Sequence, residues 1–156
     1  MGKILVVDDQ SGVRCLLVEV FKEDKYEVET AATGEKALRL LISFDPDLIL
    51  LDMKMPGMNG IETLEQIRGL GSQVAVILMT GYGDDAHSME QAKELGILGY
   101  LAKPFDLFEL RERVSEILNN SEIITKENNA ELLLSAIIFT KIISSYSQLA
   151  CELAIL

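Results

Sequence analysis

The sequence predicts a doubly wound α/β sandwich, which is a parallel sheet with helices on both faces. Short apolar runs alternate with longer segments of helical periodicity through the first 118 residues. The segments that join them are short, as they are in β/α units. Three of the apolar runs also lack polar alternation, which is typical of interior strands that helices cover on both sides.

The predicted strands are four apolar runs and one alternating segment. Each run is too short for a helix and is flanked by charged residues, Gly or Pro. The runs are Ile4–Val7, Leu48–Leu51, Val74–Met79 and Gly99–Ala102. The remaining strand, Glu27–Ala31, comes second in the chain. Because it alternates and carries charge, we expect it at an edge of the sheet.

Helical periodicity fills the intervals between and after the strands. Apolar residues recur there at spacings of three and four, as in helices with one buried face. The predicted helices are 11–23, 34–44, 60–69, 85–95 and 106–118. Right-handed crossovers and the edge position of the second strand give the sheet order 2-1-3-4-5, the (βα)5 flavodoxin-like arrangement. Such a sheet binds ligands at the carboxyl ends of its first and third strands, where the winding reverses.

The C-terminal residues break this pattern. We expect a domain of residues 1–118, a polar linker over 119–131 and an extra amphipathic helix over 132–156. The helix is expected to pack on the domain or on a second copy of the chain, which would form a homodimer. A membrane anchor is the less favoured alternative, because Lys141 lies within the apolar segment and Ser, Gln and Thr are frequent there.

Composition and charge exclude several classes of function. Hydrophobic residues make up 49% of the chain, enough for a globular core. A formal net charge of -11 repels phosphates, so we expect no nucleic-acid partner. Cys15 and Cys151 show no metal-ligand spacing, and we expect both to be buried and reduced. The first apolar run is too short for a signal peptide, which predicts a cytoplasmic protein.

Three carboxylates lie at the predicted ligand-binding edge. Asp8 and Asp9 directly follow the first strand, and Asp52 closes the third. Their mutual repulsion calls for a cation, and a small cluster of hard oxygen ligands suits Mg²⁺. A single Asp at a strand end often caps a turn or helix, but three at one edge favour the metal.

Two hydrogen-bond donors follow the neighbouring strands. Thr80 ends the fourth strand and Lys103 the fifth, so we expect a hydroxyl and an ammonium to face the carboxylates. Such donors can bind the oxygens of a phosphoryl group on Asp52 and neutralise the charge that develops during in-line transfer.

With their flanking sequence, these residues resemble the receiver domain of two-component response regulators. The resemblance covers about residues 1–118. Within that family it is strongest to the single-domain regulators of sporulation phosphorelays. Four blocks carry it in order: Leu5–Asp9, Leu50–Gly60, Met79–Tyr82 and Tyr100–Phe105.

The resemblance implies a role for each site residue. Asp52 is the phosphoacceptor, and Asp9 and Asp52 bind Mg²⁺ directly. Asp8 acts through a bound water, and the backbone carbonyl of Lys54 is the remaining protein ligand. Thr80, Lys103 and Tyr100 are the remaining site residues.

The resemblance also implies how the signal is received and passed on. Thr80 and Lys103 bind the phosphoryl oxygens, and Tyr100 is the switch residue. The phosphoryl donor is the phosphohistidine of a histidine kinase or histidine phosphotransfer protein. Catalysis is limited to self-phosphorylation and slow self-dephosphorylation. The domain then signals by protein–protein interaction or passes the phosphoryl group on, with no DNA-binding output domain.

A partner surface is predicted on the first helix and after the fifth strand. Apolar residues on the first helix wrap further round than one core-facing stripe requires. Some of this surplus is expected to form a docking face with residues that follow the last strand. The surface consists of Gly12, Val13, Leu16, Pro104 and Phe105.

A Mg²⁺-dependent phosphohydrolase with an aspartyl-phosphate intermediate is the alternative from the enzyme class. The same carboxylates and lysine would serve it. Haloacid dehalogenase-like enzymes, however, need a second acid two residues after the nucleophile, where this chain has Lys54. The sequence also has no segment for a substrate cap domain, and it therefore favours the receiver.

Overall fold

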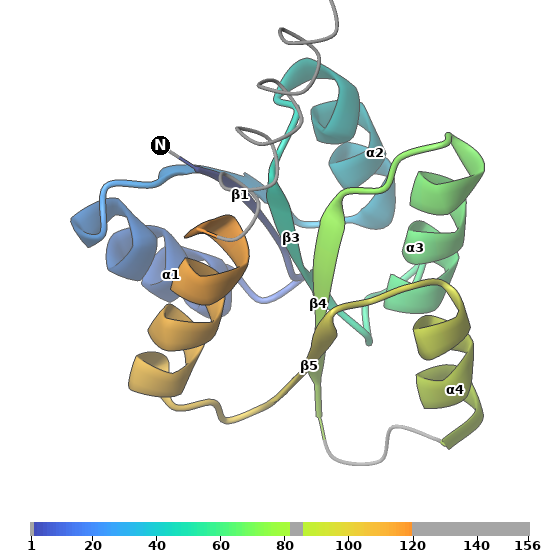
Figure 1. Ribbon diagram of the computed structural model, residues 1–156. Coiled ribbons are helices and arrows are strands. Elements are labelled where there is room, and N and C mark those ends of the chain that lie inside the picture. The colour runs from blue at the N-terminus through green and yellow to red at the C-terminus, as the bar shows by residue number, and fades with distance from the viewer. Residues whose placement is uncertain (1, 82–85, 120–156) are drawn as a thin grey trace, which may run out of the picture. The chain divides into compact units, whose positions relative to one another are not determined.

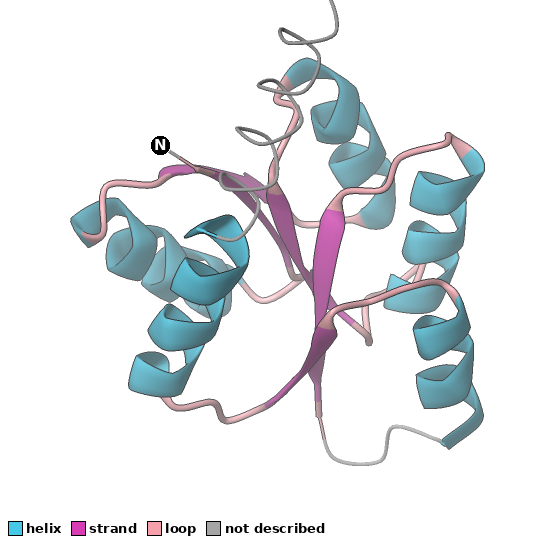
Figure 2. Ribbon diagram, in the orientation of Figure 1, coloured by secondary structure: helices cyan, strands magenta, loops and turns pink. Residues whose placement is uncertain are grey.

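The computed structural model describes residues 2–81 and 86–119. These residues form a parallel five-stranded sheet in the order β2-β1-β3-β4-β5, with helices on both faces (Figures 1 and 2). The strands are β1 (Lys3–Val7), β2 (Glu27–Ala31), β3 (Leu48–Asp52), β4 (Ala75–Thr80) and β5 (Gly99–Ala102). The predicted fold class, strand order and edge position of β2 are confirmed.

The helices divide between the two faces of the sheet. They are α1 (Ser11–Glu23), α2 (Gly34–Ser43), α3 (Gly60–Gly69), α4 (Ala86–Glu94) and a last helix over 107–119. The last helix packs beside α1 on one face, while α2, α3 and α4 cover the other (Figure 1). Each of these helices was predicted, and the observed ends fall within one residue of the expected ones.

Two apolar layers form the core, one on each face of the sheet. Along β1, Leu5 and Val7 face the α2–α3 side, and Ile4 and Val6 face α1 and the last helix. The central strand β3 is buried over its whole length. The prediction that the runs without alternation are interior strands is therefore confirmed.

The start of α3 is fixed against the end of β3. A reciprocal capping pair begins the helix, because Asn59 Oδ1 accepts from the Glu62 N–H at 2.9 Å and the Glu62 carboxylate accepts from the Asn59 N–H at 3.0 Å. The Gly60 N–H donates to the Met53 carbonyl at 3.0 Å. A Cβ at Gly60 would lie only 2.3 Å from the Asp52 carbonyl oxygen. Glycine thus lets α3 begin directly beside the strand end that carries Asp52.

One prediction about α1 is wrong. Cys15 is exposed, because the buried face of this helix is formed by Leu17, Val20 and Phe21. Cys151, the predicted linker beyond Asn119 and the predicted C-terminal helix lie outside the described residues. The chain's contacts divide it into units of Met1–Leu118 and Asn119–Leu156. In the part of the chain that the structure describes, no helix is long and apolar enough to cross a membrane.

Candidate functional site

Three carboxylates meet at the carboxyl end of the sheet. Ligand oxygens of Asp8, Asp9 and Asp52 all lie within 4.8 Å of one another. Asp8 is fully buried and Asp52 is 4% exposed, whereas Asp9 is open to solvent. Like charges held this close repel, and burial adds to the cost of each charge. The donor set is therefore suited to a hard divalent cation that can enter from the Asp9 side.

Strand pairing brings these residues together. Val7 of β1 is in register with Leu51 of β3, so the residues that follow them, Asp8 and Asp52, lie at the same level of the sheet. The Asp8 N–H donates to the Ala31 carbonyl of β2 at 3.1 Å, which continues the pairing one residue past β1. Strand pairing thus places Asp8 and Asp52, whereas Asp9 lies one residue beyond the paired backbone.

Lys103 brings a positive charge into the carboxylate cluster. Its Nζ lies 2.6 Å from Asp8 Oδ2 and 2.9 Å from Asp52 Oδ1. The Lys103 side chain is largely buried, and its backbone N–H donates to the Thr80 carbonyl at 2.6 Å. One ammonium therefore bridges two of the three carboxylates.

The site perturbs the pKa values of Asp52 and Lys103. Burial raises the pKa of Asp52; Lys103 opposes this rise, the charges of Asp8 and Asp9 add to it, and the net change is upward. Burial alone would lower the pKa of Lys103, but its hydrogen bonds and attraction to Asp8 and Asp52 outweigh burial and raise it. The Lys103 ammonium therefore stays charged at neutral pH. The Asp52 carboxylate is less stable in its charged form than a carboxylate in water, because Lys103 does not fully offset its burial.

Thr80 and Tyr100 direct their hydroxyls to backbone carbonyls. Thr80 is buried at the end of β4, and its hydroxyl lies 3.5 Å from the Leu101 carbonyl oxygen. The half-buried Tyr100 on β5 donates its hydroxyl hydrogen to the Met89 carbonyl of α4. The structure thus groups the three carboxylates with Lys103. The hydroxyls of Thr80 and Tyr100 instead bind the backbone carbonyls of Leu101 and Met89.

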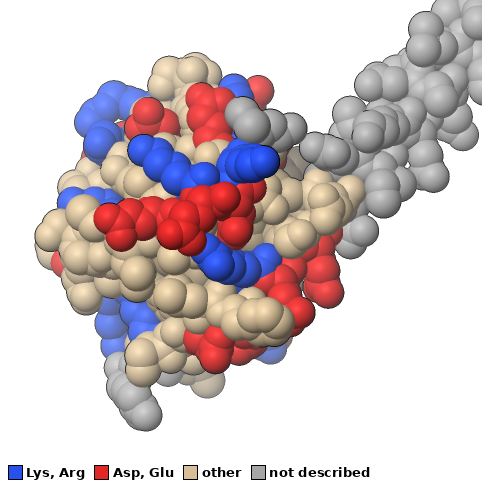
Figure 3. All heavy atoms as spheres, turned by 90° about the vertical axis from the view of Figure 1, so that its left-hand side faces the viewer, with Lys and Arg blue, Asp and Glu red and all other residues tan. Residues whose placement is uncertain are grey.

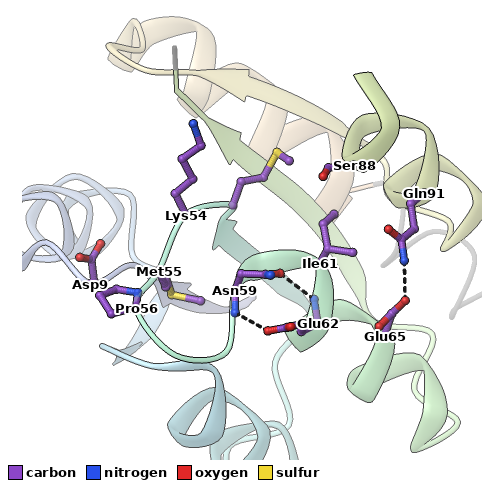
Figure 4. Close-up of a pocket in the computed structure, with 11 residues that line it drawn as sticks. Asp9, Lys54, Met55, Pro56, Asn59, Ile61, Glu62, Glu65, Ser88 and Gln91 are labelled. Atoms are coloured by element: carbon purple, nitrogen blue, oxygen red, sulfur yellow. Dashed lines mark hydrogen bonds between the residues drawn. The ribbon is translucent and has the colours of Figure 1, made fainter. Parts of the chain in front are cut away.

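The loop after β3 lines a cavity of about 740 Å³ beside the carboxylates. Figure 4 shows Asp9 and Lys54 on one side of it, and Glu65 and Gln91 on the other, where a hydrogen bond joins α3 to α4. The Lys54 side chain is exposed. The cavity leaves the Asp9 side of the cluster accessible, and the metal role of the Lys54 carbonyl stays a prediction.

The predicted partner surface is only partly exposed. Gly12, Leu16 and Pro104 are exposed, whereas Val13 and Phe105 are half-buried and pack against the core. The surrounding α1 side of the molecule carries acidic and basic side chains in adjacent clusters around uncharged surface (Figure 3).

Sequence reasoning missed one residue that lines a groove with Leu16 of the predicted partner surface, and one that contacts the backbone of the acidic pair. Phe108 is 70% exposed and, with the 42% exposed Leu16, lines a groove of about 380 Å³ between α1 and the last helix. Phe108 lies off the core-facing stripe of the last helix, and this position was the sequence signal for an exposed aromatic side chain. Arg14 on α1 donates to the backbone carbonyls of Asp8 and Asp9, and a lone arginine carries no sequence signal for such a contact.

Sequence comparisons identify related proteins. The family model of the response regulator receiver domain matches residues 4–115. Sporulation initiation phosphotransferase F of Bacillus subtilis is 47% identical over 116 residues, which cover 74% of this chain and 93% of that protein. The alkaline phosphatase synthesis transcriptional regulatory protein PhoP of Bacillus subtilis is 38% identical over 121 residues, 78% of this chain. This chain spans only 50% of that regulator.

Solved structures show the same fold. A CheY-like response regulator receiver domain protein from Methanospirillum hungatei matches with a TM-score of 0.74 and 30% identity, covering 78% of this chain and 97% of that one. Chemotaxis protein CheY4 of Vibrio cholerae matches with a TM-score of 0.69 and 28% identity, covering 75% of this chain and 98% of that one.

Proposed function

The chain belongs to the family of response regulator receiver domains, and on this basis we propose that Asp52 accepts a phosphoryl group from a phosphohistidine donor. The observation that supports this most is the position of Asp52 at the end of the central strand. Its carboxylate lies 2.9 Å from the Lys103 ammonium and within 4.8 Å of ligand oxygens of Asp8 and Asp9. The Asp52 carboxylate can act as the nucleophile. A cation bound by the cluster would offset the repulsion among the three carboxylates.

The transfer is an in-line substitution at phosphorus. An oxygen of Asp52 forms the new P–O bond as the donor's P–N bond breaks, and the bonding electrons pass to the imidazole nitrogen. Lys103 transfers its hydrogen bond from the Asp52 carboxylate to a phosphoryl oxygen, and the Thr80 hydroxyl provides a second donor. The protein's own contribution is therefore the position of the nucleophile and of two donors.

The same residues fit Mg²⁺. When bound, the ion supplies positive charge that neutralises the phosphoryl oxygens. We assign Asp9, Asp52 and the Lys54 carbonyl as direct ligands and Asp8 as a ligand through water. The indirect role of Asp8 is supported by its existing partners, because its Oδ1 accepts from the Gln10 N–H at 2.8 Å and its Oδ2 accepts from Lys103.

Phosphorylation is reported through Thr80 and Tyr100. The Thr80 hydroxyl contact of 3.5 Å is long for an O–H donor, so exchanging it for a phosphoryl oxygen costs little. Tyr100 precedes Leu101, the residue that Thr80 would release, and its own hydroxyl is bound to α4. We expect the ring to turn inward and the α4–β5 surface to change.

The switch is tested by adding beryllofluoride, a phosphoryl analogue, with Mg²⁺. Amide resonances of α4 and β5 should shift, while those of β2, at the far edge of the sheet, should change little. Tyr100→Phe removes the hydrogen bond to α4 and should shift the α4 resonances without beryllofluoride. Unchanged resonances over residues 81–105 in the parent would contradict the switch.

The partner is a histidine kinase or a histidine phosphotransfer protein. The docking surface that we propose consists of Gly12, Val13, Leu16, Pro104 and Phe105, and Leu16 also lines the groove between α1 and the last helix. Phe108 and Leu16 are large, exposed apolar residues at this groove, a feature typical of interaction surfaces. The output is protein–protein interaction or onward phosphoryl transfer.

The proposed organisation comprises a receiver (1–118), a linker (119–131) and a helix (132–156) that packs on the receiver or on a second copy. Truncation after residue 120 should leave a folded monomer that is still phosphorylated. The full chain should be larger by size-exclusion chromatography or more stable. Recovery of the full chain only in the membrane fraction would favour an anchor instead.

Phosphorylation itself is tested with acetyl phosphate and Mg²⁺. The parent should be labelled and Asp52→Asn should not. Asp45→Asn is the matched control, because Asp45 is exposed, precedes β3 and has a positive φ that Asn tolerates. Labelling of Asp52→Asn would place the acceptor elsewhere. Sustained turnover of a generic phosphate ester would favour the phosphohydrolase.

A further inference from the structure

Arg14 lies in the first turns of α1 and contacts the backbone of the acidic pair. Its Nη1 is 2.6 Å from the Asp8 carbonyl oxygen and 2.9 Å from the Asp9 carbonyl oxygen. Strand pairing continues only as far as the Asp8 N–H, which bonds to β2. The two carbonyls beyond it are held by one guanidinium nitrogen.

The contact of Arg14 with the Asp8 and Asp9 carbonyls matters more because α1 begins without a side-chain cap. Its N-cap residue, Gln10, forms no side-chain capping hydrogen bond, in contrast to the caps of α2 and α3. The Gln10 N–H instead donates to Asp8 Oδ1 at 2.8 Å. The turn from β1 into α1 is therefore held by bonds to the acidic residues themselves, and Arg14 provides two of them.

We propose that Arg14 is a positioning residue for cation binding and phosphoryl transfer. Its guanidinium holds the backbone of Asp8 and Asp9 so that both carboxylates stay beside Asp52. The inference rests on the proposed function, because it concerns the same carboxylate cluster. It adds a role for a residue that is not among the proposed phosphoryl-binding or cation-binding residues.

The need for positioning differs among the three acids. Lys103 contacts Asp8 and Asp52, and both are buried. Asp9 is exposed, and the Arg14 bond holds its backbone. Repulsion from the buried pair drives Asp9 toward solvent, so without Arg14 its carboxylate would have to be reordered each time a cation binds. Loss of a residue that orients metal ligands typically weakens metal binding about 10- to 100-fold.

A purely electrostatic role would have the opposite sign. Removing a positive charge near an anionic cluster strengthens the attraction for a cation. Positioning predicts weaker Mg²⁺ binding in Arg14→Met, whereas electrostatics alone predicts tighter binding. Arg14→Lys keeps the charge but replaces the planar guanidinium with a single ammonium. It should therefore restore only part of the affinity.

The experiment uses the full chain with Mg²⁺ alone, followed by NMR, and then labelling by acetyl phosphate. Arg14→Met should raise the Mg²⁺ dissociation constant about tenfold or more and slow labelling at limiting Mg²⁺, with recovery when Mg²⁺ is saturating. Arg14→Lys should fall between this variant and the parent. Lys22→Met, an exposed cation lost from the same helix, should leave the constant within about twofold.

The outcomes separate the positioning role of Arg14 from the proposed function. If the parent binds Mg²⁺ and is labelled while Arg14→Met binds Mg²⁺ equally or more tightly, the positioning role is wrong and the proposed function stands. If the parent neither binds Mg²⁺ nor is labelled, both fail. Should Arg14→Met not fold, as judged by its amide spectrum, Arg14→Lys decides, and parent-like affinity in that variant overturns the role.

Discussion

The amino end of the sheet and its carboxyl end both gather charged side chains, but they use the charge differently. At the amino end, Arg68 of α3 donates to four carbonyl oxygens at 2.8 to 3.3 Å, those of Leu95, Ser72, Val74 and Gly96. The guanidinium links the end of α3, the entry to β4 and the end of α4. Its charge is matched by the dipoles of four backbone carbonyls.

At the carboxyl end, the charges outnumber their partners. Three carboxylates have oxygens within 4.8 Å of one another, and the Lys103 ammonium lies at hydrogen-bond distance from two of them, Asp8 and Asp52. Burial raises the pKa of Asp52, and the charges of Asp8 and Asp9 add to the rise. The difference teaches that the amino end stabilises the fold, whereas the carboxyl end retains repulsion that a bound cation can relieve.

The largest expected effect comes from forcing the start of α3 away from the end of β3. Gly60→Ala places a Cβ 2.3 Å from the Asp52 carbonyl oxygen and 2.8 Å from the Met53 Cα, both backbone atoms that cannot yield easily. We expect a loss of about 3 kcal/mol in the free energy of unfolding by urea denaturation, together with slower labelling. Gly69→Ala, with nothing within 4 Å of its Cβ, is the control and should change stability by under about 1 kcal/mol. Equal effects of the two changes would contradict the close approach.

Breaking the amino end should affect stability alone. Arg68→Met leaves four carbonyls without their guanidinium partner, and we expect about 2 kcal/mol of destabilisation. At low denaturant, where the variant stays folded, labelling by acetyl phosphate should match that of the parent. Arg39→Met, an exposed arginine on α2, should have little effect on either measurement. Slow labelling of folded Arg68→Met would show that the two ends are coupled.

Adding a cation should stabilise the protein through the carboxyl end. At 100 times its dissociation constant, Mg²⁺ should raise the free energy of unfolding by about 2.7 kcal/mol. Asp9→Asn leaves two charged carboxylates, both already bonded to Lys103, and should abolish most of this gain. Asp45→Asn should keep the gain in full. A parent-like Mg²⁺ response in Asp9→Asn would remove Asp9 from the ligand set.

The smallest expected effect is a pH dependence of stability without metal. Because the pKa of Asp52 is raised in the folded protein, the folded state binds more protons than the unfolded state between 3.8 and the raised pKa. Its contribution to stability therefore falls as pH rises through that window. Asp52→Asn should lack this fall and be more stable than the parent at neutral pH. Thermal denaturation of both proteins between pH 4 and pH 7 tests it, and parallel curves would contradict the shift.

Much of the fold was predictable because its determinants are local. Apolar runs and helical spacing reflect which face of a short segment is buried, and they located the strands and helices to within a residue. Strand order followed from the handedness of crossovers. The meeting of Asp8, Asp9 and Asp52 followed in turn, because neighbouring parallel strands end at the same level of the sheet.

The sequence by itself therefore determined the elements, their order and the edge where the acids collect. Only the tertiary structure decided which long side chains reach which partners. It turned Lys103 toward Asp8 as well as Asp52, directed the Thr80 hydroxyl to β5 and placed Arg14 on two carbonyls. It also exposed Cys15 and Phe108. Such contacts depend on where distant segments present their polar groups, and local periodicity records only whether a residue faces the core.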